Sequence, residues 1–297
     1  MFKSSSLVFL YMICKYNIIN QNLPPSFQDS IIHKKEDKDI VSYQTNEKSH
    51  YSREVNNKYS NLKRKLSSSK KNLILGIVTN YKWKVIQPFF KSFEAVGFEN
   101  CDCVVFVSNI AENTTKKIES CGVIVKYIPK EYEKMIANQI RFKLYSDYLK
   151  ENLDKYNLVL HVDIRDSIFQ KDFFQFFDSK KPFLGITVED GFMTEYYNKK
   201  WFLYSFGEEV YKRVEKKRIL CSGTIWGTAD KFLQLVNIMW EKVQIKNGLY
   251  NKEVSDQPIF NYIIYIDKIF DDCIIKTDNK DGIILTLGLY RKASLDS

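Results

Sequence analysis

From residue 72 onward, short apolar runs alternate with amphipathic stretches, and this alternation predicts an α/β domain. The first apolar runs are six or seven residues long and are bounded by polar residues, as strands buried in a parallel sheet are. The stretches between them carry apolar residues three and four positions apart, which is the period of a helix with one buried face. The predicted strands and helices follow one another as 73–79, 86–96, 103–108, 114–120, 123–128 and 136–152.

Strands that alternate with helices in this way predict a mainly parallel, doubly wound sheet with right-handed crossovers and helices on both faces. Further along the chain, the pattern predicts strands at 158–162 and 182–188, a basic helix at Glu208–Arg218 and an apolar helix at Pro258–Ile266. No internal repeat is visible, and the length suffices for a sizeable core. We therefore expect one α/β domain over residues 72–297.

The strand at 158–162 ends abruptly in charged residues. Asp163, Arg165 and Asp166 follow it directly, and apolar residues resume at Ile168. In open α/β sheets, ligands bind just outside the carboxyl ends of the strands. Carboxylates there are hard oxygen ligands, which suit Mg²⁺ or Mn²⁺ in contact with the phosphates of a substrate. The segment therefore indicates a metal–diphosphate site, and the alternative is an ordinary ion-pair cluster at the end of a strand.

The excess of basic residues lies ahead of the predicted domain. The chain has a formal net charge of +9, but residues 1–71 hold 13 Lys and Arg against 6 Asp and Glu, which leaves 32 against 30 in the domain. A domain so nearly balanced argues against a dedicated nucleic-acid groove. Residues 20–71 are polar, basic and without a sustained period, and they predict a disordered stem.

Residues 1–19 predict a signal for the secretory pathway. A basic start at Lys3 precedes an apolar run over 7–14, which is too short to span a bilayer and fits a signal-peptide core. Lys15 interrupts the run and no clear cleavage site follows, so a short signal-anchor that tethers the chain to the membrane is the alternative to a cleaved peptide. Together with a glycosylation sequon at Asn113, this favours the Golgi or ER lumen; the alternative is the cytoplasm.

Several separate blocks occur in order between about Leu73 and Asn261. They are Gly76-Ile-Val-Thr-Asn-Tyr81, Arg141 with Tyr145, Asp163-Ile-Arg-Asp-Ser-Ile-Phe-Gln-Lys-Asp-Phe173, Cys221-Ser-Gly-Thr-Ile-Trp-Gly227, and Asp256-Gln257 with Asn261. In these blocks the chain resembles the GT-A superfamily of nucleotide-diphospho-sugar glycosyltransferases, and more closely the group whose acidic motif reads Asp-x-Arg-Asp followed by Phe-Gln. The five blocks together are fairly specific for the superfamily and much less so for the substrate.

The resemblance implies a donor site around the acidic motif. Asp163 and Asp166 would hold Mn²⁺ or Mg²⁺ against the donor diphosphate, with Asp166 the surer ligand and Asp163 acting through water or holding Arg165. Arg165 is assigned to the donor rather than to the metal, because two cations would repel each other. Thr79 and Tyr81 lie where such enzymes meet the nucleotide, and Tyr81 would stack on the base or is a plain loop aromatic.

Three more residues are implied in donor binding. Arg141, near the start of the helix before the acidic strand, would contact the diphosphate through two hydrogen bonds, or would pair with a surface carboxylate. Ser222 and Gly223 would lie against the donor, since a glycine lets the backbone approach a ligand closely.

Acidic residues elsewhere are implied in acceptor binding and catalysis. Asp256 would contact the acceptor hydroxyl or sugar and act as a general base, or would only cap the helix that follows it. Glu189 and Asp190, just past a strand end, are the other acidic candidates for the acceptor.

Two departures from the family pattern bear on activity. Cys221 stands where the family usually has Asn, which removes an amide donor and acceptor. Many GT-A enzymes also carry a late His that completes the metal shell, whereas this chain has no His after His161. Asp278 and Asp281 lie in the region of that late His and would be the residues to substitute for it. We expect a metal-dependent glycosyltransferase that moves a sugar from a nucleotide-diphosphate sugar to a glycan, protein or lipid acceptor; the alternative is a non-catalytic GT-A-like domain that binds a nucleotide or a glycan.

Overall fold

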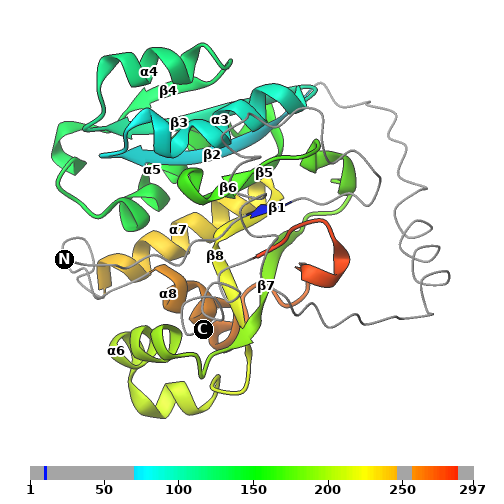
Figure 1. Ribbon diagram of the computed structural model, residues 1–297. Helices are drawn as coiled ribbons and strands as arrows, with labels where there is room; N and C mark the ends of the chain where they lie inside the picture. The colour runs from blue at the N-terminus through cyan, green and yellow to red at the C-terminus, as the bar shows by residue number, and fades with distance from the viewer. Residues whose placement is uncertain (1–9, 12–69, 246–255, 287–297) are drawn as a thin grey trace, which may run out of the picture. The chain divides into compact units, whose positions relative to one another are not determined.

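Figure 1 shows the computed structural model of the chain, which describes residues 10–11, 70–245 and 256–286. All of these residues belong to one compact unit. The predicted signal segment and stem lie outside the described residues, except for Leu10–Tyr11, which form strand β1 and pair in parallel with β6 (Ser167–Ile168). No helix in the described ranges combines the length and the apolar character needed to cross a membrane.

A seven-stranded sheet forms the centre of the domain, with its strands in the order β4-β3-β2-β5-β8-β7-β9. The strands are β2 (Lys71–Thr79), β3 (Cys101–Ser108), β4 (Ile124–Tyr127), β5 (Tyr156–Val162), β7 (Leu184–Phe192), β8 (Arg218–Thr228) and β9 (Ile274–Asp278). β8 runs antiparallel to both of its neighbours, and every other pair in this sheet is parallel. The mainly parallel α/β sheet predicted from the sequence is therefore confirmed.

Helices α3, α4, α5 and α8 lie close to their predicted places, whereas α6 does not. The helices are α3 (Trp83–Val96), α4 (Glu112–Glu119), α5 (Ala137–Asn152), α6 (Tyr196–Lys212), α7 (Ala229–Ile245) and α8 (Asp256–Tyr262), which continues as a π-helical turn over Ile263–Asp267. Single 3₁₀ turns occur at Lys130–Tyr132, Leu153–Lys155, Ile164–Asp166, Phe173–Phe176 and Asn279–Asp281. α3 ends at Gly97, whose φ of 60° only a glycine adopts readily, as the sequence predicts.

The path of the chain through the sheet reverses between β2 and β5. From β2 the chain passes through α3 to β3 and through α4 to β4, and α5 then returns it to β5 on the other side of β2. Because parallel crossovers are right-handed, α5 covers the opposite face of the sheet from α3 and α4. In doubly wound sheets, ligands bind at the carboxyl ends of the two strands that flank such a reversal.

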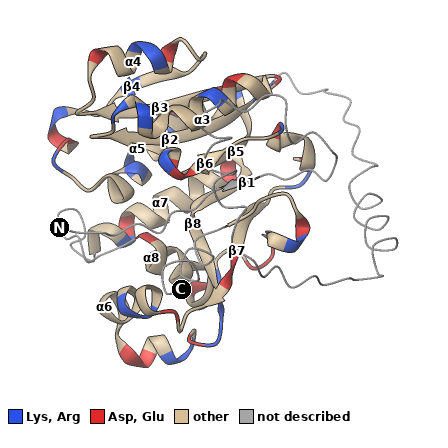
Figure 2. Ribbon diagram, viewed as in Figure 1, with Lys and Arg blue, Asp and Glu red and all other residues tan. Residues whose placement is uncertain are grey.

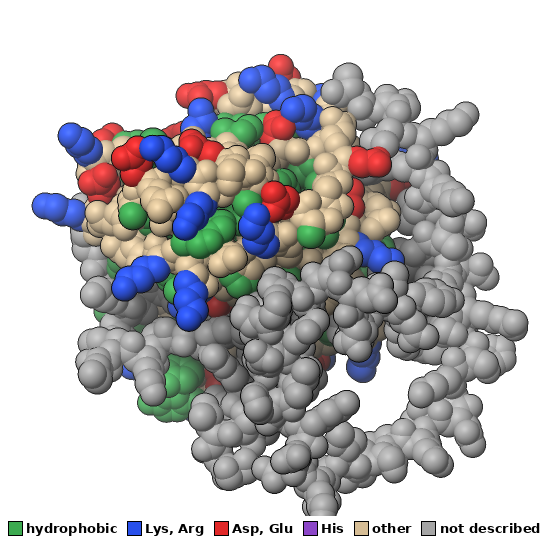
Figure 3. Space-filling model, turned by 45° about the horizontal axis from the view of Figure 1, so that its top comes forward, with side chains coloured by type: hydrophobic (Ala, Val, Ile, Leu, Met, Phe, Trp, Pro, Cys, Tyr) green, Lys and Arg blue, Asp and Glu red, His purple; other side chains and the backbone are tan. Residues whose placement is uncertain are grey.

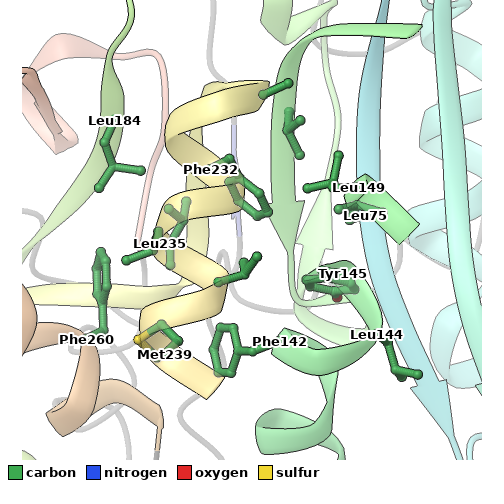
Figure 4. Packing of buried hydrophobic residues seen from close by; sticks show 14 of the residues in the cluster. Leu75, Phe142, Leu144, Tyr145, Leu149, Leu184, Phe232, Leu235, Met239 and Phe260 are labelled. Atoms are coloured by element: carbon green, nitrogen blue, oxygen red, sulfur yellow. The ribbon is translucent and has the colours of Figure 1, made fainter. Parts of the chain in front are cut away.

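The main hydrophobic core lies on the α5 face of the sheet. α5 and α7 pack against each other there, and α8 packs against α7 (Figure 4). In Figure 4, Met239 of α7 lies beside Phe142 of α5, and both side chains are almost fully buried. Because Phe142, Tyr145 and Leu149 anchor α5 in this core, the N-terminal end of α5 has a fixed position at the edge of the sheet.

The helix predicted at Glu208–Arg218 is wrong in its bounds. α6 instead covers Tyr196–Lys212, with a break at Gly207, whose φ is 77°. The charged residues after it form a turn, and the chain enters β8 at Arg218. Helical periodicity misplaces the helix because the aromatic residues at the start of α6 are exposed, so that they do not mark its buried face.

β8, like β9 further along the chain, is a strand that the sequence pattern does not predict. Nearly all of its residues are buried, yet its apolar run is interrupted by Ser222 and Gly223, so it does not read as a strand. Small residues are required there by close neighbours. A Cβ added at Gly227 would lie 2.5 Å from the backbone oxygen of Phe183, and one at Gly223 would lie 2.5 Å from Oδ2 of Asp163.

Charged side chains of both signs are distributed over the domain. Figure 2 shows Lys and Arg next to Asp and Glu on several helices, and on the face in Figure 3 the two kinds are interspersed. This distribution agrees with the near balance of charge that the sequence gives for residues 72–297.

Candidate active site

The acidic motif lies at the reversal point of the sheet. β5 ends at Val162, and Asp163 leads into a 3₁₀ turn over Ile164–Asp166. β2 and β5 are parallel neighbours, so the loop after β2 meets this turn. The guanidinium carbon of Arg165 lies 5.9 Å from the ring centroid of Tyr81, within the range of a cation–π contact. Burial raises the pKa of Tyr81 in spite of the nearby guanidinium.

Arg165 holds the carboxylate of Asp166 through two hydrogen bonds. Its Nε donates to Oδ1 at 2.9 Å and its Nη2 donates to Oδ2 at 2.6 Å. The side chain of Asp166 is only 4% exposed, while that of Arg165 is 29% exposed. The bond to Asp166 raises the pKa of Arg165 above its ordinary value. Asp166 is the residue that the sequence predicts as the surer metal ligand, and both of its carboxylate oxygens accept hydrogen bonds from Arg165.

Arg141 joins three elements of the fold at one point. It lies in the first turns of α5, and its side chain is 3% exposed. Its Nη1 donates to Oδ1 of Asp163 at 2.6 Å, and its Nη2 donates to the backbone oxygen of Ser222 at 3.3 Å and pairs with Asp256. Burial opposes the charge of Arg141, but Asp256 and Asp163 outweigh it and raise the pKa of Arg141. The predicted pairing with a surface carboxylate is thus replaced by pairing with two residues of the candidate site.

Asp163 lies against β8 because residue 223 has no side chain. Its backbone N–H donates to the oxygen of Gly223 at 3.0 Å, and its Oδ2 occupies the space that a Cβ of residue 223 would take. The carboxylate remains 35% exposed, the most of the three carboxylates around Arg141 and Arg165. Burial, together with the charge of Asp256, raises the pKa of Asp163, and Arg141 opposes this shift.

α8 is fixed to β8 by amide side chains. Asn261 donates to the backbone oxygen of Leu220 at 2.9 Å and accepts from its N–H at 3.0 Å. Gln257 accepts weakly from Ser222 at 3.5 Å and donates through Nε2 to Oδ1 of Asn198, on α6, at 2.6 Å. These bonds hold Asp256, at the start of α8, against Arg141. Asn138 also donates a hydrogen bond to Asp256, at 3.3 Å. Asn198 is a residue that sequence reasoning missed, because α6 was misplaced.

Glu189 and Asp190 have different surroundings, although they are adjacent on β7. Glu189 is 9% exposed, and burial raises its pKa to about 7, while a bond from the thiol of Cys221 opposes this shift. Asp190 accepts from Arg218 at 3.1 Å and from Asn279 at 2.6 Å. Neighbouring residues on a strand point to opposite faces of the sheet, which explains the difference.

The structure brings most of the predicted site residues together, and leaves two apart. Hydrogen bonds, ion pairs or ring contacts connect Tyr81, Arg141, Asp163, Arg165, Asp166, Ser222, Gly223 and Asp256 in two adjoining groups. Glu189 lies next to them through Cys221, whose sulfur is 3.7 Å from the Cβ position of residue 223. Asp190 is held by Arg218, and Thr79 ends β2, where it pairs in register with Ser108 of β3.

The carboxylates suit a hard cation in their chemistry, but only in part in their arrangement. Asp163 keeps an exposed carboxylate, whereas Asp166 would have to part from Arg165 before it could bind a metal. No cluster of three or more His, Cys, Asp or Glu side chains suited to a metal occurs among the described residues. Asp278 and Asp281 bond to the backbone of their own turn, in a capping box over Asn279–Asp281.

No family model matches this chain, and no curated protein matches it either. Among solved structures, it is similar to the galactosyltransferase LgtC in complex with donor and acceptor sugar analogues, at 15% identity and a TM-score of 0.45, over 69% of this chain and 73% of that one. It is also similar to an active-site mutant of LgtC, at 14% identity and a TM-score of 0.43, over 69% and 72% of the two chains.

Proposed function

We propose that this chain is a glycosyltransferase that moves a sugar from a nucleotide-diphosphate sugar to a hydroxyl group of a glycan, protein or lipid acceptor. The observation that carries the proposal is the contact of Arg141 with both Asp163 and Asp256. These three residues come from three of the sequence blocks that carry the resemblance to GT-A glycosyltransferases. They meet at the carboxyl end of β5, beside the reversal point where a doubly wound sheet binds its ligand.

The donor would bind across the ends of β2 and β5. Tyr81 would contact the base, and the partly exposed guanidinium of Arg165 would turn from Asp166 to the diphosphate, which an arginine can bind through two hydrogen bonds. A bound Mn²⁺ or Mg²⁺ would neutralise charge on the departing diphosphate as a Lewis acid. Asp163 would hold that cation, joined by Asp166 once Arg165 has moved. Gly223 leaves room for these ligands beside Asp163.

Of the acidic candidates, Glu189 is the one whose pKa best suits it to accept the proton of the acceptor hydroxyl. A general base works best when its pKa lies near the working pH, and burial brings that of Glu189 to about 7. Asp256 already pairs with Arg141, and Asp190 with Arg218. We therefore assign the proton-accepting role to Glu189 and a positioning role to Asp256.

The direct test is release of nucleotide from UDP- and GDP-sugars by the full-length chain, with and without Mn²⁺. We expect nucleotide release to require Mn²⁺. Asp166→Ala should reduce it at least about 100-fold, which is the scale of a lost electrostatic contact to a leaving group. Asp147→Asn, at an exposed pair with Lys143, is the matched control and should keep full activity. Release that survives both chelation and Asp166→Ala would defeat the assignment.

A non-catalytic domain that binds a nucleotide or a glycan is the second candidate. The observation that favours it is that both arginines of the site, Arg141 and Arg165, are already neutralised by carboxylates within the protein. Calorimetry separates the two candidates. Binding of UDP or GDP that Mn²⁺ does not change, without hydrolysis or transfer, would select the non-catalytic domain.

We also propose that the domain faces the lumen of the secretory pathway, on a tether formed by the N-terminal segment. The proposal rests on the apolar run after Lys3 and on the sequon at Asn113, which is exposed in the first turn of α4. Treatment of the expressed protein with a glycosidase should remove the glycan on Asn113 and shift the band of the protein on a gel. Asn113→Gln should abolish that shift. An unglycosylated chain that fractionates with cytosol would refute the lumenal placement.

A further inference from the structure

An aromatic surface begins beside the candidate site. Tyr196, Tyr197, Trp201 and Tyr204 occur within the first nine residues of α6, and we call these four residues the aromatic shelf. Tyr196 is 67% exposed, Tyr197 44% and Tyr204 55%. The rings of Tyr196 and Tyr197 meet edge to face at 5.1 Å between centroids, and those of Tyr197 and Trp201 lie 5.8 Å apart. Exposed aromatic rings in contact with one another mark a binding surface more often than a structural one.

The hydrophobic core does not need these rings. Asn198, Phe202 and Ser205 form the buried face of α6, and Phe202 packs into a small cluster with Met193 and Ile219. Tyr197, Trp201 and Tyr204 have the same spacing but start one residue earlier. They therefore form a neighbouring stripe that faces outward, since residues four and three apart share one face of a helix.

The shelf is joined to the candidate site at its N-terminal end. Glu195 caps α6 by accepting from the backbone N–H groups of Tyr197 and Asn198, at 3.1 and 3.4 Å. The side chain of Asn198 accepts from Gln257, which in turn contacts Ser222 of β8. The charge of Glu195 also contributes to the raised pKa of Glu189. In Figure 1, α6 accordingly lies beside α8.

The dimensions and chemistry of the shelf fit a chain of sugars. From Tyr197 to Tyr204 the helix rises by about 10 Å, at about 1.5 Å per residue, which is long enough for more than one sugar ring. A pyranose presents a face of C–H groups that stacks on an aromatic ring, while its hydroxyl groups stay in water. Tyrosine hydroxyls on the shelf can donate and accept hydrogen bonds alongside.

We propose that the aromatic shelf binds the sugars of a glycan acceptor that lie beyond the one receiving the transferred sugar. The proposal rests on the glycosyltransferase function proposed above, and it narrows the acceptor to an oligosaccharide rather than a bare hydroxyl of a protein or lipid. The shelf would hold the acceptor along α6, with its reactive end directed towards Glu189.

The test is binding of the full-length chain to a printed array of defined oligosaccharides and monosaccharides. We expect the wild-type protein to bind a subset of oligosaccharides, and Tyr197→Ala combined with Trp201→Ala to lose that binding at least about tenfold. Trp201→Phe alone, which keeps a ring, should retain most of it. Tyr127→Ala is the matched control, because Tyr127 is 70% exposed on β4 at the other edge of the sheet.

Nucleotide release from UDP- and GDP-sugars, measured on the same preparations, separates this proposal from the proposed function. Release without acceptor should be equal in the wild type and in the shelf variants, which also shows that the variants fold. Oligosaccharide binding that survives the double substitution, or an array that stays blank with the wild type, would overturn the shelf. Shelf-dependent binding without any nucleotide release would leave the shelf standing and refute the transferase.

Discussion

Two groups of acidic residues meet beside β8, and their surroundings give them different properties. Asp163 and Asp256 are tied to the buried guanidinium of Arg141, so both carboxylates face a permanent positive charge. Glu189 is buried next to the thiol of Cys221, no Lys or Arg among the described residues forms an ion pair with its carboxylate, and its pKa rises to about 7. The comparison indicates that the first group is a fixed electrostatic frame, while Glu189 is the residue that exchanges a proton near neutral pH.

The largest effect is expected from breaking the frame. Arg141→Met removes the guanidinium that pairs with the buried carboxylate of Asp256 and the partly exposed carboxylate of Asp163, which should lower the free energy of unfolding by about 3–5 kcal/mol. Lys143→Met, two residues along the same helix, removes a partly exposed pair with Asp147 and should cost less than about 1 kcal/mol. Urea unfolding of both variants measures the difference. Equal losses would mean that Arg141 has no special structural role.

The fit of Asp163 against β8 can be tested with one methyl group. In Gly223→Ala the added Cβ would lie 2.5 Å from Oδ2 of Asp163, so the carboxylate must move. We expect a loss of about 1–3 kcal/mol in stability and a loss of nucleotide release of about 100-fold, the scale at which misplacement of a site residue is felt. Gly97→Ala, strained at φ 60° but far from the site, should lose stability and keep activity. Similar activity in the two variants would contradict the fit.

The unusual pKa of Glu189 predicts how stability depends on pH. The folded-state pKa, about 7, lies above the ordinary value of 4.5, so the folded protein binds more protons between these two values. The contribution of Glu189 to stability is therefore present below pH 4.5 and is lost as the pH rises to about 7, by about 3 kcal/mol in total. Glu189→Gln should be stabilised relative to the wild type at pH 8 and not at pH 4. Thermal unfolding of both proteins at the two pH values measures this, and a constant difference would show that Glu189 titrates normally.

The smallest effect concerns Arg165 and Asp166. If Arg165 competes with a cation for the carboxylate of Asp166, then Arg165→Met should bind Mn²⁺ several-fold more tightly, because the oxygens are released. Lys171→Met, on the exposed turn that follows, serves as the control for the lost positive charge. Calorimetric titration with Mn²⁺ alone is sufficient. An unchanged affinity of Arg165→Met for Mn²⁺ would show that Asp166 is not a ligand of the metal.

The parts of the site that the sequence predicts are those that follow from local pattern. β2 and β5 read as buried strands, and polar residues directly after each of them have to meet at one edge of a parallel sheet. The acidic turn after Val162 and the loop at Tyr81 are therefore predictable. Arg141 is predictable as well, since α5 has a clear buried face and leads directly into β5.

The pairing of these residues depends on contacts between distant segments, and no local pattern encodes it. β8 contains Ser222 and Gly223 where a strand would usually have apolar residues, because Asp163 and α8 need the space. Its antiparallel insertion brings Cys221 to Glu189, and so gives a physical role to a residue that departs from the family pattern. The ion pair of Arg141 with Asp256 likewise forms only when α8 docks on β8.

The comparison of the two groups is tested most directly by the pH dependence of nucleotide release from the active donor, in the wild type and in Glu189→Gln. With Glu189 as proton acceptor and the Arg141 group as a fixed frame, the rate of the wild type should rise with pH through about 7 and then level off. Glu189→Gln should be slower by about 100-fold or more and should lose this rise. A variant that keeps the rate and the pH profile of the wild type would contradict the account.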